Sequence, residues 1–209
     1  MFITLEGIDR SGKTTQAALL AEALGPDTLL IREPGGTEMA EGVRALLKDP
    51  ALEMGDMAEL LLFSAARADL AERVIEPGRA AGRDIVCDRY IDSTAAYQGI
   101  ARGIGLGKVE GLMDLVVGTC MPDVTVLIRV DADTAHARGQ QRLKAGEEDG
   151  SDRFESEGIE FQRRVASAYE EIASRHRERI VVVDGAGAPA EVHRRVLDAV
   201  VDRVPGYRE

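Results

Sequence analysis

The stretch Gly7-Ile8-Asp9-Arg10-Ser11-Gly12-Lys13-Thr14 decides the fold of this chain. It fits the pattern G-x-x-x-x-G-K-[ST], follows a short apolar run and precedes a sequence of helical period, as a phosphate-binding loop requires. The glycines let backbone N–H groups turn toward phosphate oxygens, and the helix that follows directs its positive end at them. We therefore predict that these eight residues bind a nucleoside triphosphate, with Lys13 on the β- and γ-phosphates and Thr14 on Mg²⁺.

Around this loop, apolar runs rich in β-branched residues alternate with longer stretches of helical period. The alternation is typical of βαβ units and a parallel sheet. Strands are expected at 2–6, 28–32, 85–88, 124–130 and 180–184. Helices are expected at 13–24, 37–48, 56–76, 92–99, 108–118, 132–145, 154–177 and 189–203. The predicted fold is a single α/β domain over 1–209 with a five-stranded parallel sheet, helices on both faces and a mobile lid at 139–153.

Composition excludes several classes of protein. The 209 residues carry 26 Lys and Arg against 37 Asp and Glu, a net charge of −11 that repels the backbone of nucleic acids. With 44% hydrophobic residues the chain can build a core, so it is not disordered. No apolar run approaches the ~20 residues of a membrane helix, and MFITLEGI does not resemble a signal peptide. Two cysteines make no disulfide framework, and we expect a cytoplasmic protein.

Asp88 ends the apolar run Ile85-Val86-Cys87. An acidic residue at that place resembles the strand-end carboxylate that holds Mg²⁺ in phosphate-loop enzymes. An ordinary strand-end Asp that caps a helix is an equally good interpretation at this stage. Cys87 itself is expected to be a small core residue.

Four stretches in this order resemble the thymidylate kinase family. They are the phosphate-binding loop, REPGGT at 32–37, DRY at 88–90 followed by STAAYQG at 93–99, and DRFE at 152–155. The resemblance extends over essentially the whole chain. It implies a P-loop kinase that phosphorylates dTMP to dTDP with ATP and Mg²⁺, and that forms a homodimer.

The resemblance also implies roles for single residues. Phe63 and Arg67 resemble the pair that stacks on thymine and hydrogen-bonds its O4, and residues four apart share one helix face. Arg89 resembles the residue that grips the acceptor phosphate, which suits a planar guanidinium. The remaining substrate-binding positions that the resemblance suggests are Asp9, Glu33, Pro34, Thr94, Tyr97 and Gln98.

The predicted chemistry needs positioning and charge stabilisation, not covalent help. A phosphate monoester with a second pKa of about 6 is mostly dianionic at neutral pH, so its oxygen needs no general base. Accordingly, we expect His136, His176 and His193 to be surface residues. Family members place a charge-stabilising Arg either in the loop or in the lid, whereas this chain has Arg10 in the loop and Arg142, Lys144 and Arg153 in or beside the lid. Both Arg10 and Arg153 are therefore candidate catalytic residues, together with Lys13 and Arg89, and we expect Arg10 to contribute more.

Three rival functions follow from the same residues. A related kinase of the same fold could act on dUMP, dCMP or shikimate. A GTP-dependent switch would need an N-K-x-D motif to read guanine, and the chain contains no Asn. An ATP-driven motor on nucleic acid is disfavoured by the short length and the acidic charge.

Overall fold

The computed structural model describes residues 1–145, 153–154 and 157–203. Residues 146–152 of the expected lid, including Asp152, lie outside the described residues, as does Glu155 of the DRFE stretch. Of Arg142, only the position in its helix is described. The mobility of the lid therefore stays a prediction.

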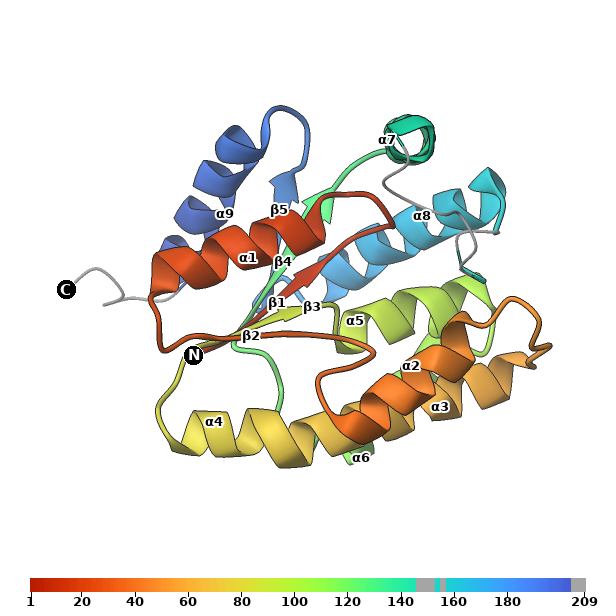
Figure 1. Cartoon of the computed structure of the whole chain (residues 1–209), viewed down its shortest axis with the longest axis horizontal. Helices are drawn as coiled ribbons and strands as arrows, with labels where there is room; N and C mark the ends of the chain where they lie inside the picture. The colour runs from red at the N-terminus through yellow and green to blue at the C-terminus, as the bar shows by residue number, and fades with distance from the viewer. Residues whose placement is uncertain (146–152, 155–156, 204–209) are drawn as a thin grey trace.

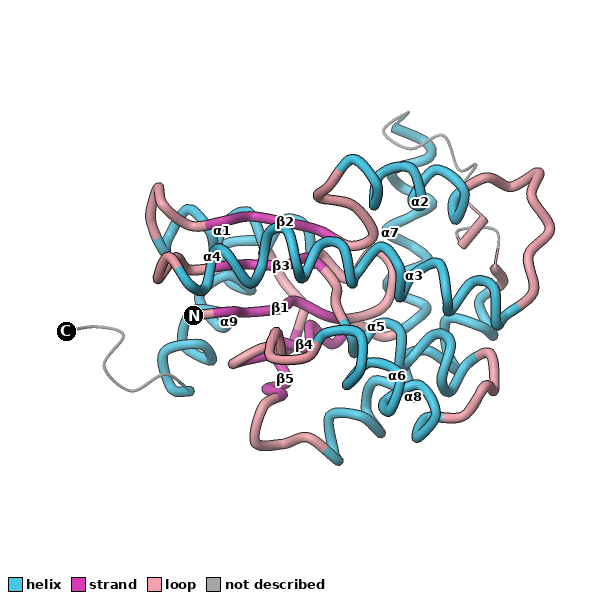
Figure 2. The backbone as a smooth tube through the Cα atoms, turned by 90° about the horizontal axis from the view of Figure 1, so that it is seen from below, coloured by secondary structure: helices cyan, strands magenta, loops and turns pink. Residues whose placement is uncertain are grey.

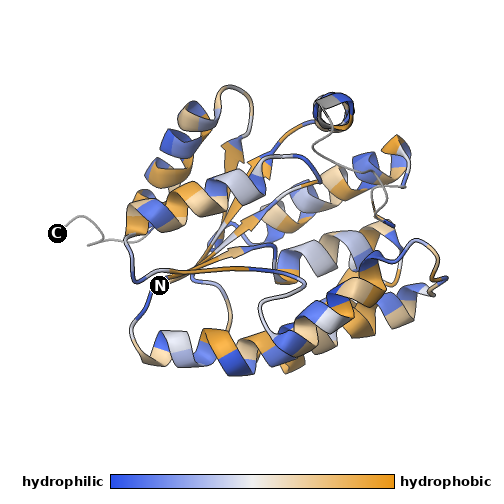
Figure 3. Ribbon diagram, in the orientation of Figure 1, coloured by the Kyte–Doolittle hydropathy of each residue, from blue (hydrophilic) through white to orange (hydrophobic). Residues whose placement is uncertain are grey.

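Five parallel strands form one sheet in the order β2-β3-β1-β4-β5 (Figure 1). Their bounds are β1 Phe2–Glu6, β2 Leu29–Arg32, β3 Ile85–Asp88, β4 Val124–Arg129 and β5 Ile180–Asp184, each within one residue of the expected ranges. The central strands are apolar and buried on both faces, as expected for a parallel sheet covered by helices (Figure 3).

Helices cover both faces of the sheet. On one face lie α1 (Lys13–Leu24) and α9 (Pro189–Arg203), which contact each other and the strands. On the other face, α3 (Asp56–Leu70), α6 (Leu106–Val117) and α8 (Ile159–Arg175) lie beneath the strands (Figures 1 and 2). Two further helices, α2 (Glu38–Lys48) and α7 (Ala132–Ala145), follow the carboxyl ends of β2 and β4. None of the helices in the described part of the chain has the length and apolarity needed to cross a bilayer.

Two long predicted helices differ from the structure by several residues at one end. The helix expected at 154–177 begins only at Ile159, because Gly158 is extended, with φ −66° and ψ 166°. The helix expected at 56–76 continues through a π-helical segment η1 (Ala71–Ile75) into α4 (Glu76–Ala80). Pro77 lies at the start of α4, directly after the π-helical segment, and the chain stays helical through it.

The helix expected at 92–99 is a four-residue α5 (Ile91–Thr94) followed by a π-helical segment η2 (Ala95–Ala101). Hydrophobic periodicity cannot reveal this change, since one added residue per turn alters hydrogen bonding more than it alters the apolar pattern. The π-helical segment turns the side chains of Tyr97 and Gln98 toward the site described below.

The histidine prediction holds for one residue and fails for two. His136 is exposed on α7. His176 is half-buried at the end of α8, and its Nε2 lies 3.1 Å from Glu110 Oε1. His193 is half-buried on α9, where burial lowers the pKa of its imidazole. Both sit at packed helix contacts, so polar sequence neighbours did not indicate exposure.

Candidate functional site

The phosphate-binding loop follows β1 and ends where α1 begins at Lys13. Gly7 has φ +144°, and a Cβ there would lie 2.6 Å from the carbonyl oxygen of Ile128, so the position requires glycine. Lys13 Nζ donates to the Ile8 carbonyl at 2.7 Å. Burial, assisted by nearby Arg89, lowers the pKa of Lys13 to about 8. A buried, cationic lysine beside a helix N-terminus is an arrangement that binds phosphate oxygens.

Thr14 and Asp88 lie together although 74 positions separate them. Thr14 Oγ1 donates to Asp88 Oδ2 at 2.5 Å. The other carboxylate oxygen, Asp88 Oδ1, is buried and has no hydrogen-bond partner among the residues that the structure describes. A hydroxyl and a carboxylate with one unpartnered oxygen, beside a phosphate loop, are the hard oxygen ligands that Mg²⁺ prefers. The residues present therefore fit a magnesium ion. This favours the interpretation of Asp88 as a metal ligand over its interpretation as a helix cap.

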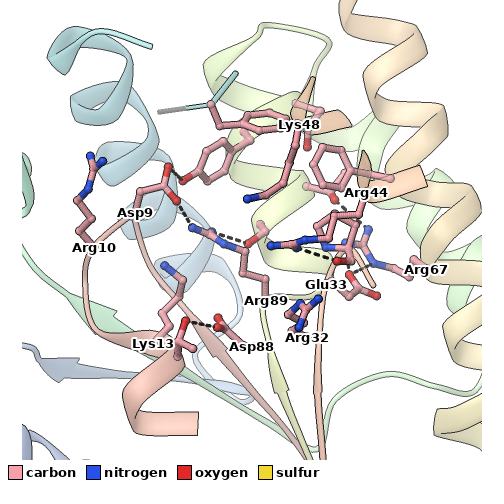
Figure 4. A pocket seen from close by; sticks show the side chains of 18 of the residues that line it. Asp9, Arg10, Lys13, Arg32, Glu33, Arg44, Lys48, Arg67, Asp88 and Arg89 are labelled. Atoms are coloured by element: carbon pink, nitrogen blue, oxygen red, sulfur yellow. Dashed lines mark hydrogen bonds and ion pairs between the residues drawn. The ribbon is translucent and has the colours of Figure 1, made fainter. Parts of the chain in front are cut away.

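A cavity of about 430 Å³ opens at the carboxyl ends of β1, β2 and β3, beside the loop (Figure 4). Ligands of open α/β sheets bind at such a crevice. Its charged lining is Asp9, Arg10, Lys13, Arg32, Glu33, Arg44, Lys48, Arg67, Asp88 and Arg89. Seven of these ten side chains are basic, in a chain of net charge −11. The electrostatic potential of the cavity therefore favours the binding of a small anion.

Arg89 lies at the centre of this cavity and has φ +70°. Its guanidinium forms an ion pair with Asp9 and donates to Ser93 Oγ at 3.1 Å. It also lies over the ring of Tyr97, 5.3 Å from the centroid. Burial acts to raise the pKa of Asp9, but Arg89 and then Lys13 outweigh it and hold that pKa below its usual value. Asp9 therefore fixes a guanidinium in the middle of the cavity.

Arg67 is more deeply buried than Arg89 and has more hydrogen-bond partners that are themselves buried. It is 1% exposed, and its NH2 lies 2.6 Å from Glu33 Oε2. NH1 donates to Thr94 Oγ1 at 2.8 Å, and NH2 donates to the Tyr90 carbonyl at 3.0 Å. Burial raises the pKa of Glu33 to about 7 despite this partner. Phe63, one helical turn before Arg67, faces Phe154 with ring centroids 5.7 Å apart.

Comparison with known proteins now assigns the chain. The family model for thymidylate kinase matches residues 5–196. The chain belongs to the thymidylate kinase family. A thymidylate kinase of Desulfosudis oleivorans is 42% identical over 210 residues, covering 98% of both chains, and one of Syntrophotalea carbinolica is 43% identical over 201 residues, covering 93% of this chain and 92% of that one.

Solved structures agree with this assignment. The crystal structure of thymidylate kinase from Ehrlichia chaffeensis superposes with a TM-score of 0.78 at 36% identity, covering 96% of this chain and 98% of that one. As a member of this family, the protein is a phosphotransferase that uses ATP to convert dTMP to dTDP. The expected P-loop kinase fold with a five-stranded parallel sheet is confirmed.

The two candidate arginines of this thymidylate kinase lie in different places. The Arg10 side chain is directed away from Arg89 and Arg67 (Figure 4). It lies on α7 at Gly139, where a Cβ would stand 2.4 Å from Arg10 Nε. Arg153 instead donates from NH2 to Glu59 Oε2 at 2.6 Å and from Nε to the Leu47 carbonyl at 3.1 Å. Arg10 therefore borders the phosphate loop, whereas Arg153 contacts α3 behind the cavity.

Several site residues escaped the sequence analysis. Arg44 and Lys48 line the cavity from α2, and Arg44 NH1 donates to the Pro34 carbonyl at 2.8 Å. Their spacing of four residues on a helix that follows EPGGT was the available signal. Phe154 lies within the DRFE stretch, but nothing local indicated that it would face Phe63.

A second cavity of about 430 Å³ lies on the other side of the phosphate loop. Arg10, Arg138, Gly187 and Pro189 contribute to its lining. Arg138 NH2 donates to the Gly185 carbonyl at 3.0 Å, and NH1 donates to the carbonyls of Arg10 and Ser11 at 3.4 and 3.3 Å. Arg138 thus joins the loop to the end of β5.

Proposed function

We propose that the first cavity is the dTMP site of this kinase and that the second takes the base of ATP. The observation that carries the proposal is the basic cavity that adjoins the phosphate loop at the strand ends. An anionic acceptor bound there would lie beside the γ-phosphate of a bound donor, which supports the proposal. All nine predicted substrate residues line it: Asp9, Glu33, Pro34, Phe63, Arg67, Arg89, Thr94, Tyr97 and Gln98.

Within the acceptor site, Arg89 binds the phosphate of dTMP. Its guanidinium is central and is already oriented by Asp9, so little side-chain entropy is lost on binding. Thymine lies between α3 and η2, with Phe63 against its ring and with O4 taking the Arg67 N–H that now donates to Met113 Sδ. Tyr97, oriented by Asp9 at 3.2 Å, lies beside the sugar and crowds its 2′ position.

The donor phosphates bind to residues 7–14. Lys13 and the loop N–H groups contact the β- and γ-phosphates, and Thr14 and Asp88 would hold Mg²⁺. When bound, the ion neutralises charge on the transferred group. Arg10 reaches the transferring phosphoryl from the loop, because its backbone is fixed there and its side chain alone must turn. The dTMP oxygen attacks without a general base, consistent with a site built from arginine and lysine.

We further propose that the protein is a cytoplasmic homodimer. Met57 and Leu61 on α3 and Leu115 on α6 are 54%, 53% and 82% exposed, although α3 and α6 pack together. Exposed apolar side chains on adjoining helices are typical of protein interfaces. Both cysteines, Cys87 and Cys120, are buried free thiols, as in reducing compartments. Light scattering on the wild type and on Leu61→Glu tests the dimer, which the charge should dissociate.

An acceptor panel tests the proposed site. ADP release with ATP and Mg²⁺ is followed for dTMP, dUMP, dCMP, dGMP and AMP. We expect the highest kcat/KM for dTMP and poor use of both purines, because a thymine-sized slot against the ring of Phe63 rejects the larger bases sterically. Comparable kcat/KM for AMP or dGMP would contradict the placement of thymine there, and preference for another pyrimidine would favour a rival kinase function.

A further inference from the structure

A buried carboxylate lies behind the wall of the acceptor cavity. Glu59, in the first turn of α3, is 1% exposed and does not itself line the cavity. It precedes Phe63 by four residues and Arg67 by eight, so all three project from one side of the helix. Glu59 has no role in the proposed phosphoryl transfer. Its burial nevertheless costs free energy that only strong partners offset.

Those partners come from two segments, η2 with its C-cap Arg102, and Arg153. Glu59 Oε2 accepts from Arg153 NH2 at 2.6 Å and from Arg102 NH2 at 3.4 Å. Oε1 accepts from Gln98 Nε2 at 2.7 Å and, at 3.4 Å, from Arg102 Nε. A carboxylate paired with guanidinium groups can only accept hydrogen bonds, so Gln98 must turn its NH₂ toward it. The opposite end of the amide, Oε1, is therefore the end left for the cavity that Gln98 lines.

The carboxylate has little freedom to turn. Arg102 is held on its far side by Glu157, with NH1 2.5 Å from Oε1, and it lies over the ring of Phe161 at 4.6 Å. Arg153 is anchored by the Leu47 carbonyl. Two guanidinium groups that are fixed elsewhere thus orient Glu59, and Glu59 in turn orients the Gln98 amide.

Gln98 then presents an acceptor to the base between α3 and η2. Arg67 NH1, which donates to the weak acceptor Met113 Sδ at 2.9 Å, can turn that N–H to the base as a donor. The edge of thymine carries the complement, an acceptor at O4 beside a donor at N3–H. Cytosine carries the reverse, an amino donor beside an acceptor nitrogen, and leaves both protein groups unpaired. We propose that Glu59 is a positioning residue that sets the choice of thymine over cytosine by fixing the orientation of the Gln98 amide. This inference rests on the proposed placement of thymine in the cavity.

The isosteric variant Glu59→Gln tests it. The guanidinium groups can bind only the oxygen of the new amide, so its NH₂ must face Gln98 and turn that amide over. The cavity then offers a donor where N3–H of thymine needs an acceptor. We expect kcat/KM to fall for dTMP and to rise for dCMP, so that the dTMP-to-dCMP ratio drops by about 10- to 100-fold.

Glu157→Gln is the matched control, because it makes the same chemical change in the same network without touching Gln98. Its ratio should equal that of the wild type. Adding Glu59→Gln to Gln98→Leu should change the ratio no further than Gln98→Leu alone. Should Glu59→Gln not fold, Glu59→Gln/Arg102→Met removes one charge of each sign, and we expect the same drop.

Two results would overturn the account, and they differ. An unchanged ratio in the folded Glu59→Gln variant, or in the paired variant, shows that Glu59 serves stability alone. A wild type that uses dCMP as well as dTMP shows instead that thymine was wrongly placed, which is a failure of the proposed function.

Discussion

In the proposed site, eight consecutive residues bind the donor phosphates, whereas the acceptor half takes its side chains from α2, α3, η2, the strand ends and Phe154. The donor half works largely through backbone N–H groups whose geometry Gly7 and its neighbours fix locally. The acceptor half works through side chains that hold one another, as Glu33 holds Arg67 and Asp9 holds Arg89. A change in the first should alter the chemistry, and a change in the second should alter binding, selectivity and stability.

The largest expected effect separates the two candidate arginines. An Arg that meets the transferring phosphoryl is worth about 10³–10⁵ in kcat. We expect Arg10→Ala to lose kcat on this scale, and Arg153→Ala mainly to raise KM for dTMP, because Arg153 contacts Glu59 and not the loop. Single-turnover rates of both variants show which of the two arginines stabilises the transferring phosphoryl group. An intact rate in Arg10→Ala beside a collapse in Arg153→Ala would reverse the assignment.

The buried pair of Arg67 and Glu33 tests whether side chains of the acceptor half hold one another in place. Arg67→Met leaves the buried carboxylate of Glu33 without its partner, and breaking a buried pair typically costs about 3–5 kcal/mol. We expect such a loss in the free energy of unfolding by urea at pH 8. The double variant Glu33→Gln/Arg67→Met should regain most of it without regaining dTMP use. If Arg67→Met were as stable as the wild type, the acceptor half would not be held together by this pair.

Gly139 offers a smaller test of the donor half. Gly139→Ala places a methyl group against Arg10 and must displace that flexible side chain. We expect kcat to fall about tenfold with little change in Tm, since Ala also favours the helix by about 1 kcal/mol. Gly42→Ala on α2, where a Cβ meets nothing within 4 Å, is the matched control. Equal kcat in both variants would show that the contact of the Arg10 side chain with Gly139 of α7 has no catalytic role.

The smallest effect concerns pH. Because the pKa of Lys13 is about 8, the fraction of protonated Lys13 falls roughly tenfold between pH 7 and 9. The affinity of the free protein for an unreactive ATP analogue should weaken by about that factor over the same range. Lys13→Arg keeps its charge and should flatten the profile. A wild-type profile as flat as that of Lys13→Arg would contradict the assignment.

The fold could be predicted nearly completely because its determinants are local. The strands, the glycines of the phosphate loop and the N-terminal Pro189 of α9 each depend on a few neighbouring residues. The pairing of Thr14 with Asp88 could also be anticipated, since Asp88 ends β3 and the phosphate loop before Thr14 follows β1, the neighbouring strand.

The acceptor site was only partly predictable. The family resemblance supplied Phe63, Arg67 and Arg89, but nothing in the sequence pairs Glu59 with Gln98, 39 positions away. Nor could it show that Arg153 reaches α3. Such contacts depend on where α3 and η2 cross, and the π-helical turns that set this crossing have no signature in the apolar pattern.

Titration of dTMP into the protein without ATP tests the division of the site most directly. We expect the wild type and Arg10→Ala to bind dTMP with the same Kd, because Arg10 serves the donor half. Arg89→Ala should bind at least about 30-fold more weakly, the lower end of what losing the partner of a bound anion costs. Weakened binding by Arg10→Ala beside unchanged binding by Arg89→Ala would contradict the account.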